Sequence, residues 1–109
     1  MSKHVFLCME KIEILVIGRN PEIVQTVVRL INNNPAWNAT YALTDERAIS
    51  LFESQPFNLV LLGGGIEPES DSLLRHEFTS RNPNITIIQH YGGGSGLLAT
   101  EINMALANQ

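Results

Sequence analysis

The sequence predicts an α/β fold, in which helices cover one parallel sheet of about four strands. Short aliphatic runs rich in β-branched residues alternate along the chain with segments of helical periodicity. The runs end at glycine or at small polar residues, and the connections between them are short. Such alternation is typical of parallel sheets, whose successive strands are joined by crossover helices. A chain of 109 residues has room for one such domain with one core, which excludes a multidomain enzyme.

The first predicted unit is a strand followed by a helix. Residues 12–17 (IEILVI) are almost continuously aliphatic and stop at Gly18, which predicts a central strand buried on both faces. The segment from Pro21 to about Asn33 places its aliphatic side chains at helical spacing. Asn20 is suited to cap this helix and Pro21 to its first turn.

The second unit begins with an edge strand. Trp37, Ala39, Tyr41 and Leu43 alternate with the intervening residues, a period of two that predicts one face in contact with water. Thr44 or Asp45 can cap the helix that follows, which ends before Pro56. Its inward side chains are Ala48, Ile49, Leu51 and Phe52.

Two further units complete the predicted sheet. Residues 59–62 (LVLL) form a buried strand that ends in three glycines, and residues 85–88 form another. Between them a helix starts at Ser70 or Asp71 and ends at Asn82 and Pro83. Its inward side chains are Leu73, Leu74 and Phe78. The last helix runs from Ser95 to about Ala107, with inward residues Leu97, Leu98, Ile102, Ala105 and Leu106.

Residues 1–10 are predicted to be an N-terminal extension, and residues 11–109 the α/β domain. The apolar HVFLCM stretch is an extra strand, an ordered leader or a segment donated to a neighbouring molecule, and Met9 is an alternative start. Cys8 is expected to be an inert, partly buried thiol.

Composition narrows the range of partners and compartments. Eleven acidic residues against seven basic ones give a net charge of −4 and a pI near 5.2, so we expect no nucleic-acid partner. The longest apolar stretches are shorter than the roughly 20 residues that cross a bilayer, and we expect no membrane contact. The lone cysteine cannot form an internal disulfide, and no cysteine or histidine spacing matches a zinc site. A cytoplasmic location is expected.

Three segments of the sequence resemble parts of the receiver domain of two-component response regulators, the CheY-like family. ILVIGRNPEI stands where a receiver has its first strand and acidic pair, ALTDERAISLFESQPFNLVLLGG follows the second strand, second helix and third strand, and NPNITIIQ resembles the fourth strand. The resemblance covers roughly residues 11–92. It implies a flavodoxin-like three-layer sandwich with strand order 2-1-3-4.

The resemblance also implies a phosphate-accepting aspartate after the third strand, and a magnesium ion held by that aspartate and by an acidic pair after the first strand. Here the acceptor position is Gly63 or Gly64, and Gly18, Arg19 and Asn20 follow the first strand. Mg²⁺ requires a set of oxygen ligands, and a glycine, an arginine and an asparagine supply no anionic oxygen. We therefore expect no metal, no cofactor and no enzymatic activity. The family's switch threonine or serine falls near Tyr91, and its lysine would follow a fifth strand.

A fifth strand is not expected, because only about seventeen residues follow Gly92. The fourth strand is then an open, apolar edge, and such edges are usually covered in native proteins. The N-terminal HVFLC segment or a second copy of the protein can cover it. We therefore predict a homodimer through the fourth strand and the last helix.

A candidate anion site lies where the strands end, since ligands of open α/β sheets bind at that edge. Glycines allow backbone N–H groups to approach an anion, and a helix N-terminus favours negative charge. The candidate residues are Arg19, Gly63, Gly64, Gly65, Gly93, Gly94 and Ser95. The alternative interpretation is that these glycines only permit tight turns, since neither cluster matches a nucleotide-binding fingerprint.

No catalytic constellation is found elsewhere. His4, His76 and His90 are too scattered for a shared metal. His90 beside Tyr91 could serve acid-base chemistry, but a structural role is the simpler interpretation. Glu67, Glu69 and Asp71 could suggest a cation site, although acids here also favour a helix N-terminus.

The expected function is therefore that of a degenerate, unphosphorylated receiver that acts by self-association or by docking another signalling protein. The alternative is a small module that binds a phosphate-bearing ligand at the glycine-rich strand ends.

Overall fold

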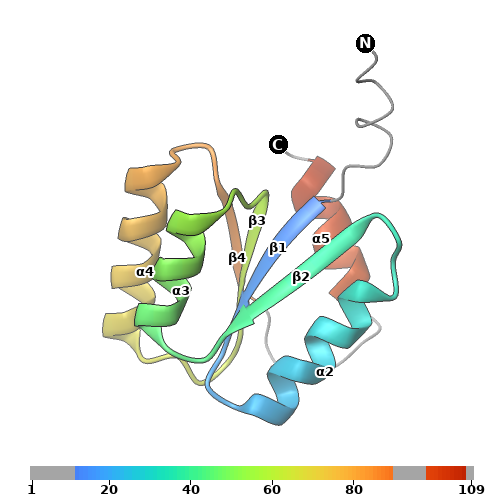
Figure 1. Ribbon diagram of the computed structural model, residues 1–109, viewed down its shortest axis with the longest axis horizontal. Coiled ribbons are helices and arrows are strands. Elements are labelled where there is room, and N and C mark those ends of the chain that lie inside the picture. The colour runs from blue at the N-terminus through green and yellow to red at the C-terminus, as the bar shows by residue number, and fades with distance from the viewer. Residues whose placement is uncertain (1–11, 90–97, 108–109) are drawn as a thin grey trace.

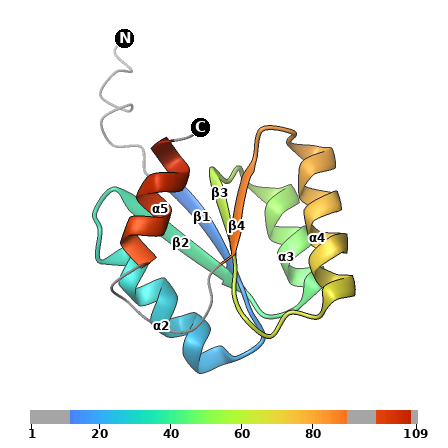
Figure 2. The same ribbon diagram turned by 180° about the vertical axis from the view of Figure 1, so that it is seen from behind.

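The computed structural model describes residues 12–89 and 98–107, and its four strands form one parallel sheet. The elements, in chain order, are β1 (Ile12–Ile17), α2 (Pro21–Asn32), β2 (Trp37–Ala42), α3 (Asp45–Ser54), β3 (Leu59–Leu62), α4 (Pro68–Arg81), β4 (Thr86–Gln89) and α5 (Leu98–Ala107). The strand order is β2-β1-β3-β4, as the resemblance in the sequence implies. Figures 1 and 2 show α3 and α4 on one face of the sheet, and α2 and α5 on the other.

Two buried clusters hold the three layers together. In β1, Ile14 and Val16 pack toward α2 and α5, whereas Leu15 and Ile17 pack toward α3 and α4. The four residues of β3 are all buried. This double burial is the reason why β1 and β3 are aliphatic without alternation, and it confirms the prediction for both strands.

The first two helices begin where the sequence predicts. The Asn20 side-chain oxygen accepts hydrogen bonds from the N–H groups of Glu22 and Ile23, at 3.0 and 3.2 Å. Thr44 caps α3 by accepting from the Arg47 N–H at 3.2 Å. Both caps satisfy donors that the first helical turn leaves without a partner.

Helix α4 begins earlier than predicted. Its first residue is Pro68, and Glu67 occupies the cap position without a side-chain cap hydrogen bond. The Asp71 N–H already donates to the Glu67 carbonyl, at 2.9 Å. The proline ring has the backbone angle that a first helical residue needs, and this outweighs the capping preference of Ser70 or Asp71.

Three side chains and one strand differ from the predicted pattern. Leu73 is 44% exposed, because only the stripe of Leu74 and Phe78, four residues apart, faces the sheet. In β2, the alternation predicts that Tyr41 faces the core and that Ala42 faces water, but Tyr41 is 39% exposed and Ala42 is buried. Ala42 packs in the cluster under α3, so helices cover both faces of this edge strand. Strand β4 starts one residue later than predicted and is half-buried throughout, because within the described residues only β3 pairs with it.

Several predictions concern residues outside the described ranges. They include the N-terminal extension with His4 and Cys8, the segment with His90 and Tyr91, and Gly93, Gly94 and Ser95 of the candidate anion site. Among the described residues, no helix is long and apolar enough to cross a membrane.

Candidate functional site

The carboxyl ends of β1, β2 and β3 meet at one edge of the sheet, and glycines shape this edge. A Cβ atom on Gly18 would lie 2.6 Å from Cγ2 of Val24, so α2 can pack this closely on β1 only because Gly18 has no side chain. A Cβ atom on Gly63 would lie 3.1 Å from the Ile17 carbonyl oxygen, and Gly65 has a φ of +83°. These three positions support the interpretation of the glycines as turn and packing residues.

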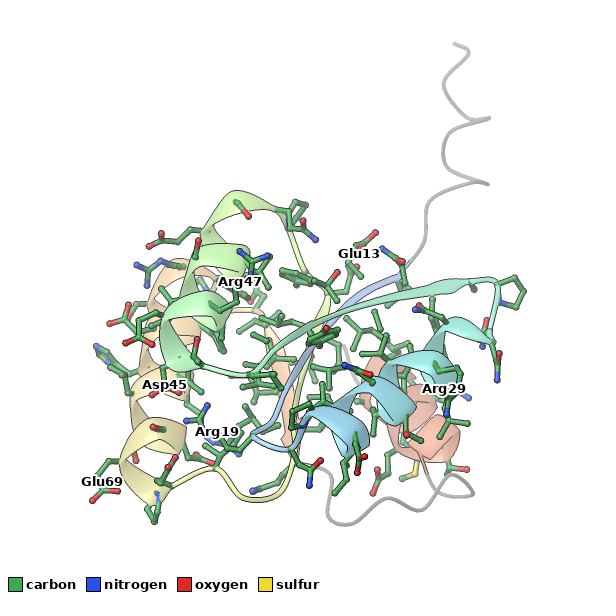
Figure 3. The ribbon with its side chains drawn as sticks, turned by 60° about the horizontal axis from the view of Figure 1, so that its bottom comes forward. Glu13, Arg19, Arg29, Asp45, Arg47 and Glu69 are labelled. Atoms are coloured by element: carbon green, nitrogen blue, oxygen red, sulfur yellow. The ribbon has the colours of Figure 1, made fainter. Side chains whose placement is uncertain are left out.

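Arg19 lies at this edge and joins three connections between strands and helices. Its Nη2 atom is 2.7 Å from Asp45 Oδ1 and 3.1 Å from Glu67 Oε1. Its Nη1 atom donates to the carbonyl of Leu43 at 3.0 Å, and Ser70 donates to Asp45 Oδ2 at 2.6 Å. Figure 3 shows Arg19 and Asp45 beside each other at the edge of the sheet. We call Arg19, Asp45, Glu67 and Ser70 the Arg19 cluster.

The pKa values in the Arg19 cluster favour the charged forms. The hydrogen bond to Asp45 is the main reason why the pKa of Arg19 is raised. Burial acts to raise the pKa of Asp45, but the hydrogen bonds from Ser70 and Arg19 outweigh it, so this pKa is lowered. The pKa of Glu67 is also lowered, first by its own backbone N–H and then by Arg19. All three groups are therefore charged at neutral pH.

This pairing alters the candidate anion site. The two carboxylates outnumber the single positive charge of Arg19, so the cluster offers no uncompensated cation to a phosphate. Arg19, Gly63 and Gly64 do lie together, around a hollow of about 230 Å³ between α2 and the ends of β1 and β3. The walls of this hollow are largely aliphatic, and the residues in it include Val16, Ile23, Val24, Val27 and Leu61. Such a lining does not compensate the charge of a phosphate group.

The acidic residues of this region do not form a metal site in the described part of the chain. No three histidine, cysteine, aspartate or glutamate side chains gather there as metal ligands would. Glu67 contacts Arg19, whereas Asp71 pairs with Arg75 one turn along α4 at 2.6 Å. Glu69 and Asp71 lie in the first turn of α4, where acids favour the helix dipole. His76 is exposed on α4.

Sequence reasoning missed the role of Asp45. It identifies Asp45 only as a candidate helix cap, because 26 residues separate it from Arg19 and nothing local links the two. A usable signal exists, however. Asp45 follows β2 and Glu67 follows β3, so the parallel topology brings both to the edge where Arg19 follows β1.

The fold matches that of known signalling domains. Neither protein-family models nor curated proteins match the sequence, but solved structures do. The signal receiver domain of an HD domain-containing protein from Pseudomonas fluorescens Pf-5 is 19% identical, with a TM-score of 0.70 over 91% of this chain and 94% of that one. The BeF3-activated DrrB receiver domain is 14% identical, with a TM-score of 0.71 over 89% and 98% of the two chains.

A third solved structure supports the same conclusion. It is the CheY-like response regulator receiver domain protein from Methanospirillum hungatei JF-1, with 17% identity and a TM-score of 0.67 over 88% of this chain and 76% of that one. The chain therefore has the flavodoxin-like α/β fold of receiver domains, as the resemblance in its sequence implied.

Proposed function

We propose that this protein is a degenerate receiver domain that takes no phosphate and acts through protein contacts. The observation that carries this proposal is the chemistry at the end of β3. Gly63 and Gly64, which follow β3 directly, have no carboxylate that could form an acyl phosphate.

The Arg19 cluster supports the loss of metal-assisted chemistry. A divalent cation needs anionic oxygens directed at an empty position. Here the oxygens of Asp45 and Glu67 contact a guanidinium instead. This arginine also bonds to the Leu43 carbonyl, so its charge and its donors are committed to groups of the fold itself.

Incubation with acetyl phosphate and Mg²⁺, followed by intact-mass spectrometry, tests the loss of phosphorylation. We expect no added phosphoryl group, while an authentic receiver domain treated in parallel gains one. A second arm uses Gly64→Asp, since a Cβ at this position meets nothing within 4 Å and the variant should fold. We expect this variant to remain unmodified as well, because Arg19 still pairs with the nearby carboxylates. A phosphorylated wild-type protein would overturn the proposal.

The contact surface that we propose is the edge formed by β4 and α5, which a second copy would cover. Within the described residues β4 pairs on one side only, and it is half-buried along its length. Beside it, Met104 of α5 is 62% exposed, and a shallow hollow of about 280 Å³ is lined by Ile88, Gln89, Glu101, Met104 and Ala105. Apolar strand edges of this kind favour pairing with another chain.

Light scattering coupled to size-exclusion chromatography tests the dimer. We expect wild-type protein to be dimeric at micromolar concentration, and Met104→Glu to shift it toward monomer by burying a charge at the interface. The matched control is Leu73→Glu, which places the same charge on the exposed face of α4 and should leave the dimer intact. A wild-type monomer, or equal effects of the two variants, would contradict this interface.

We also infer that the protein works in the cytoplasm, which its single cysteine supports.

A further inference from the structure

The other edge of the sheet, β2, is covered along only part of its length. In a parallel ladder, successive residues direct their backbone groups to opposite sides. The Gly18 N–H donates to the Ala42 carbonyl and the Ile12 N–H to the Ala36 carbonyl, so even-numbered residues face β1. Odd-numbered residues of β2 therefore direct their N–H and carbonyl groups away from the sheet.

The amino half of this outer edge already has partners. The Trp37 N–H donates to the Asn34 carbonyl at 3.0 Å, and the Ala39 N–H donates to the side-chain oxygen of Asn32 at 2.8 Å. Tyr41 is the next residue whose backbone groups face outward, and the residue is 39% exposed. The carboxyl half of β2 thus presents the Ala39 carbonyl and the Tyr41 N–H, which is the acceptor and donor pair that an added strand uses.

A hollow and a positive charge accompany this open half. The hollow has a volume of about 590 Å³ and is lined by residues 39–44 and Arg47. Arg47 is exposed, and among the described residues it forms no ion pair, in contrast to Arg19, Arg75 and Arg81. The neighbouring carboxylate of Asp45 is held by Arg19 and Ser70, so it does not neutralise Arg47.

We propose that the open half of β2 binds an extended, acidic segment of a partner protein, which adds a short fifth strand to the sheet. The backbone of that segment bonds to Ala39 and Tyr41, an acidic side chain pairs with Arg47, and an apolar one packs on the Tyr41 ring. Because the hydrogen bonds of Asn32 and Asn34 close the amino half, the added strand is only a few residues long. This surface is separate from the β4 edge, and the inference does not depend on the proposed dimer.

A random octapeptide library displayed on phage and selected on the folded full-length chain tests this inference. We expect the selected peptides to be enriched in aspartate and glutamate, and to slow hydrogen exchange at the Tyr41 amide. Arg47→Glu should weaken their binding at least tenfold, since it replaces attraction by repulsion. Arg29→Glu is the matched control, because Arg29 is an exposed arginine of α2 that lines none of this hollow, and it should leave binding within a factor of two.

A second variant keeps the test decisive. Tyr41→Pro removes the outward N–H but no bond to β1, a substitution that edge strands tolerate, and it should abolish peptide binding while circular dichroism stays unchanged. Selected peptides without acidic enrichment, or equal effects of Arg47→Glu and Arg29→Glu, would overturn the inference. Peptides that protect only amides of β4 from exchange would also overturn the inference. So would a dimer that Arg47→Glu dissociates, because a second copy of the chain would then occupy this surface.

Discussion

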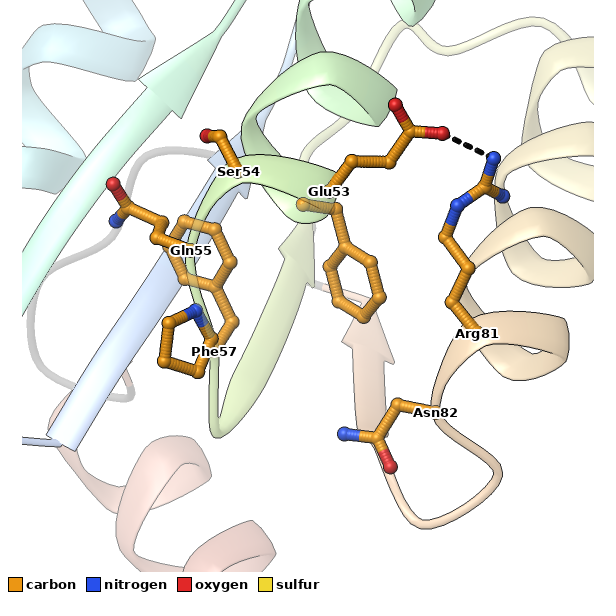
Figure 4. A pocket seen from close by; sticks show the side chains of 8 residues that line it. Glu53, Ser54, Gln55, Phe57, Arg81 and Asn82 are labelled. Carbon is orange, nitrogen blue, oxygen red and sulfur yellow. Dashed lines mark hydrogen bonds and ion pairs between the residues drawn. The ribbon is translucent and has the colours of Figure 1, made fainter.

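Arg19 and Arg81 each lie between two carboxylates, but at opposite ends of the sheet. Arg81 pairs with Glu77 on its own helix and with Glu53 at the end of α3. Figure 4 shows the Glu53–Arg81 pair at the rim of an open hollow of about 630 Å³ whose lining includes Phe52 and Phe57. Arg19 instead bonds to groups 24, 26 and 48 residues away in sequence.

The two arginines also differ in exposure. The side chains of Arg19 and Asp45 are 25% and 21% exposed, whereas those of Arg81 and Glu53 are 35% and 49% exposed. Exposed ion pairs contribute little to stability, because water screens them and ordering two long side chains costs entropy. The comparison indicates that similar ion pairs can have different roles. Arg19 holds three connections of the fold together, whereas Arg81 joins the surfaces of α3 and α4.

Replacing each arginine by alanine gives the largest expected difference. Arg19→Ala should lower the free energy of unfolding by about 2 kcal/mol, because the partly buried Asp45 and the Leu43 carbonyl lose charge-assisted hydrogen bonds. For a domain of this size that corresponds to a melting temperature about 10 °C lower. Arg81→Ala should have a much smaller effect. Urea denaturation of both variants and the wild type measures the difference.

Arg19→Lys serves as the control for charge alone. A lysine keeps the positive charge but lacks the planar fork that reaches Asp45, Glu67 and Leu43 together. We expect a stability between those of the wild type and Arg19→Ala. Equal losses for Arg19→Ala and Arg81→Ala would contradict the distinction between the two ends.

A smaller effect is expected in the pH dependence of stability. The folded-state pKa values of Asp45 and Glu67 lie below their ordinary values of 3.8 and 4.5. Their ionised forms therefore stabilise the fold above those values, and this contribution is lost as the pH falls through the lowered pKa values. Between about pH 5 and pH 3, wild-type stability should fall more steeply than that of Arg19→Ala.

Urea titrations at a series of pH values measure these slopes. Arg81→Ala is the control, and it should retain the steep acid dependence that the Arg19 cluster produces. A slope for Arg19→Ala as steep as that of the wild type would show that other carboxylates dominate the acid response.

The sequence is sufficient to predict the two side-chain caps and the burial of β1 and β3, because these features depend on local patterns, namely continuous aliphatic runs and Asn or Thr before a helix. The sheet order is not a local pattern, and its prediction rests on the resemblance to receiver domains. The errors of the sequence prediction lie where tertiary context decides. Leu73 is apolar but lies beside the buried stripe of α4, and Ala42 is buried because α3 covers the edge strand. The composition of a single helix or strand does not reveal which neighbours cover it.

The candidate site could be predicted only in part. The absence of an aspartate at Gly63 and Gly64 is visible in the sequence itself. The neutralisation of Arg19 is not, because Asp45 and Glu67 reach it only through the parallel arrangement of three strands. An arginine among glycines suggests anion binding until the carboxylates of the neighbouring connections are placed.

The hydrogen bond from the Ala39 N–H to Asn32 has a further consequence. If both edges of the sheet were open, β2 of one molecule could pair with β4 of the next. Such head-to-tail contacts do not close, and they therefore grow into filaments. Asn32 takes one of the donors that an endless ladder would need. A single amide side chain thereby disfavours polymerisation through that edge.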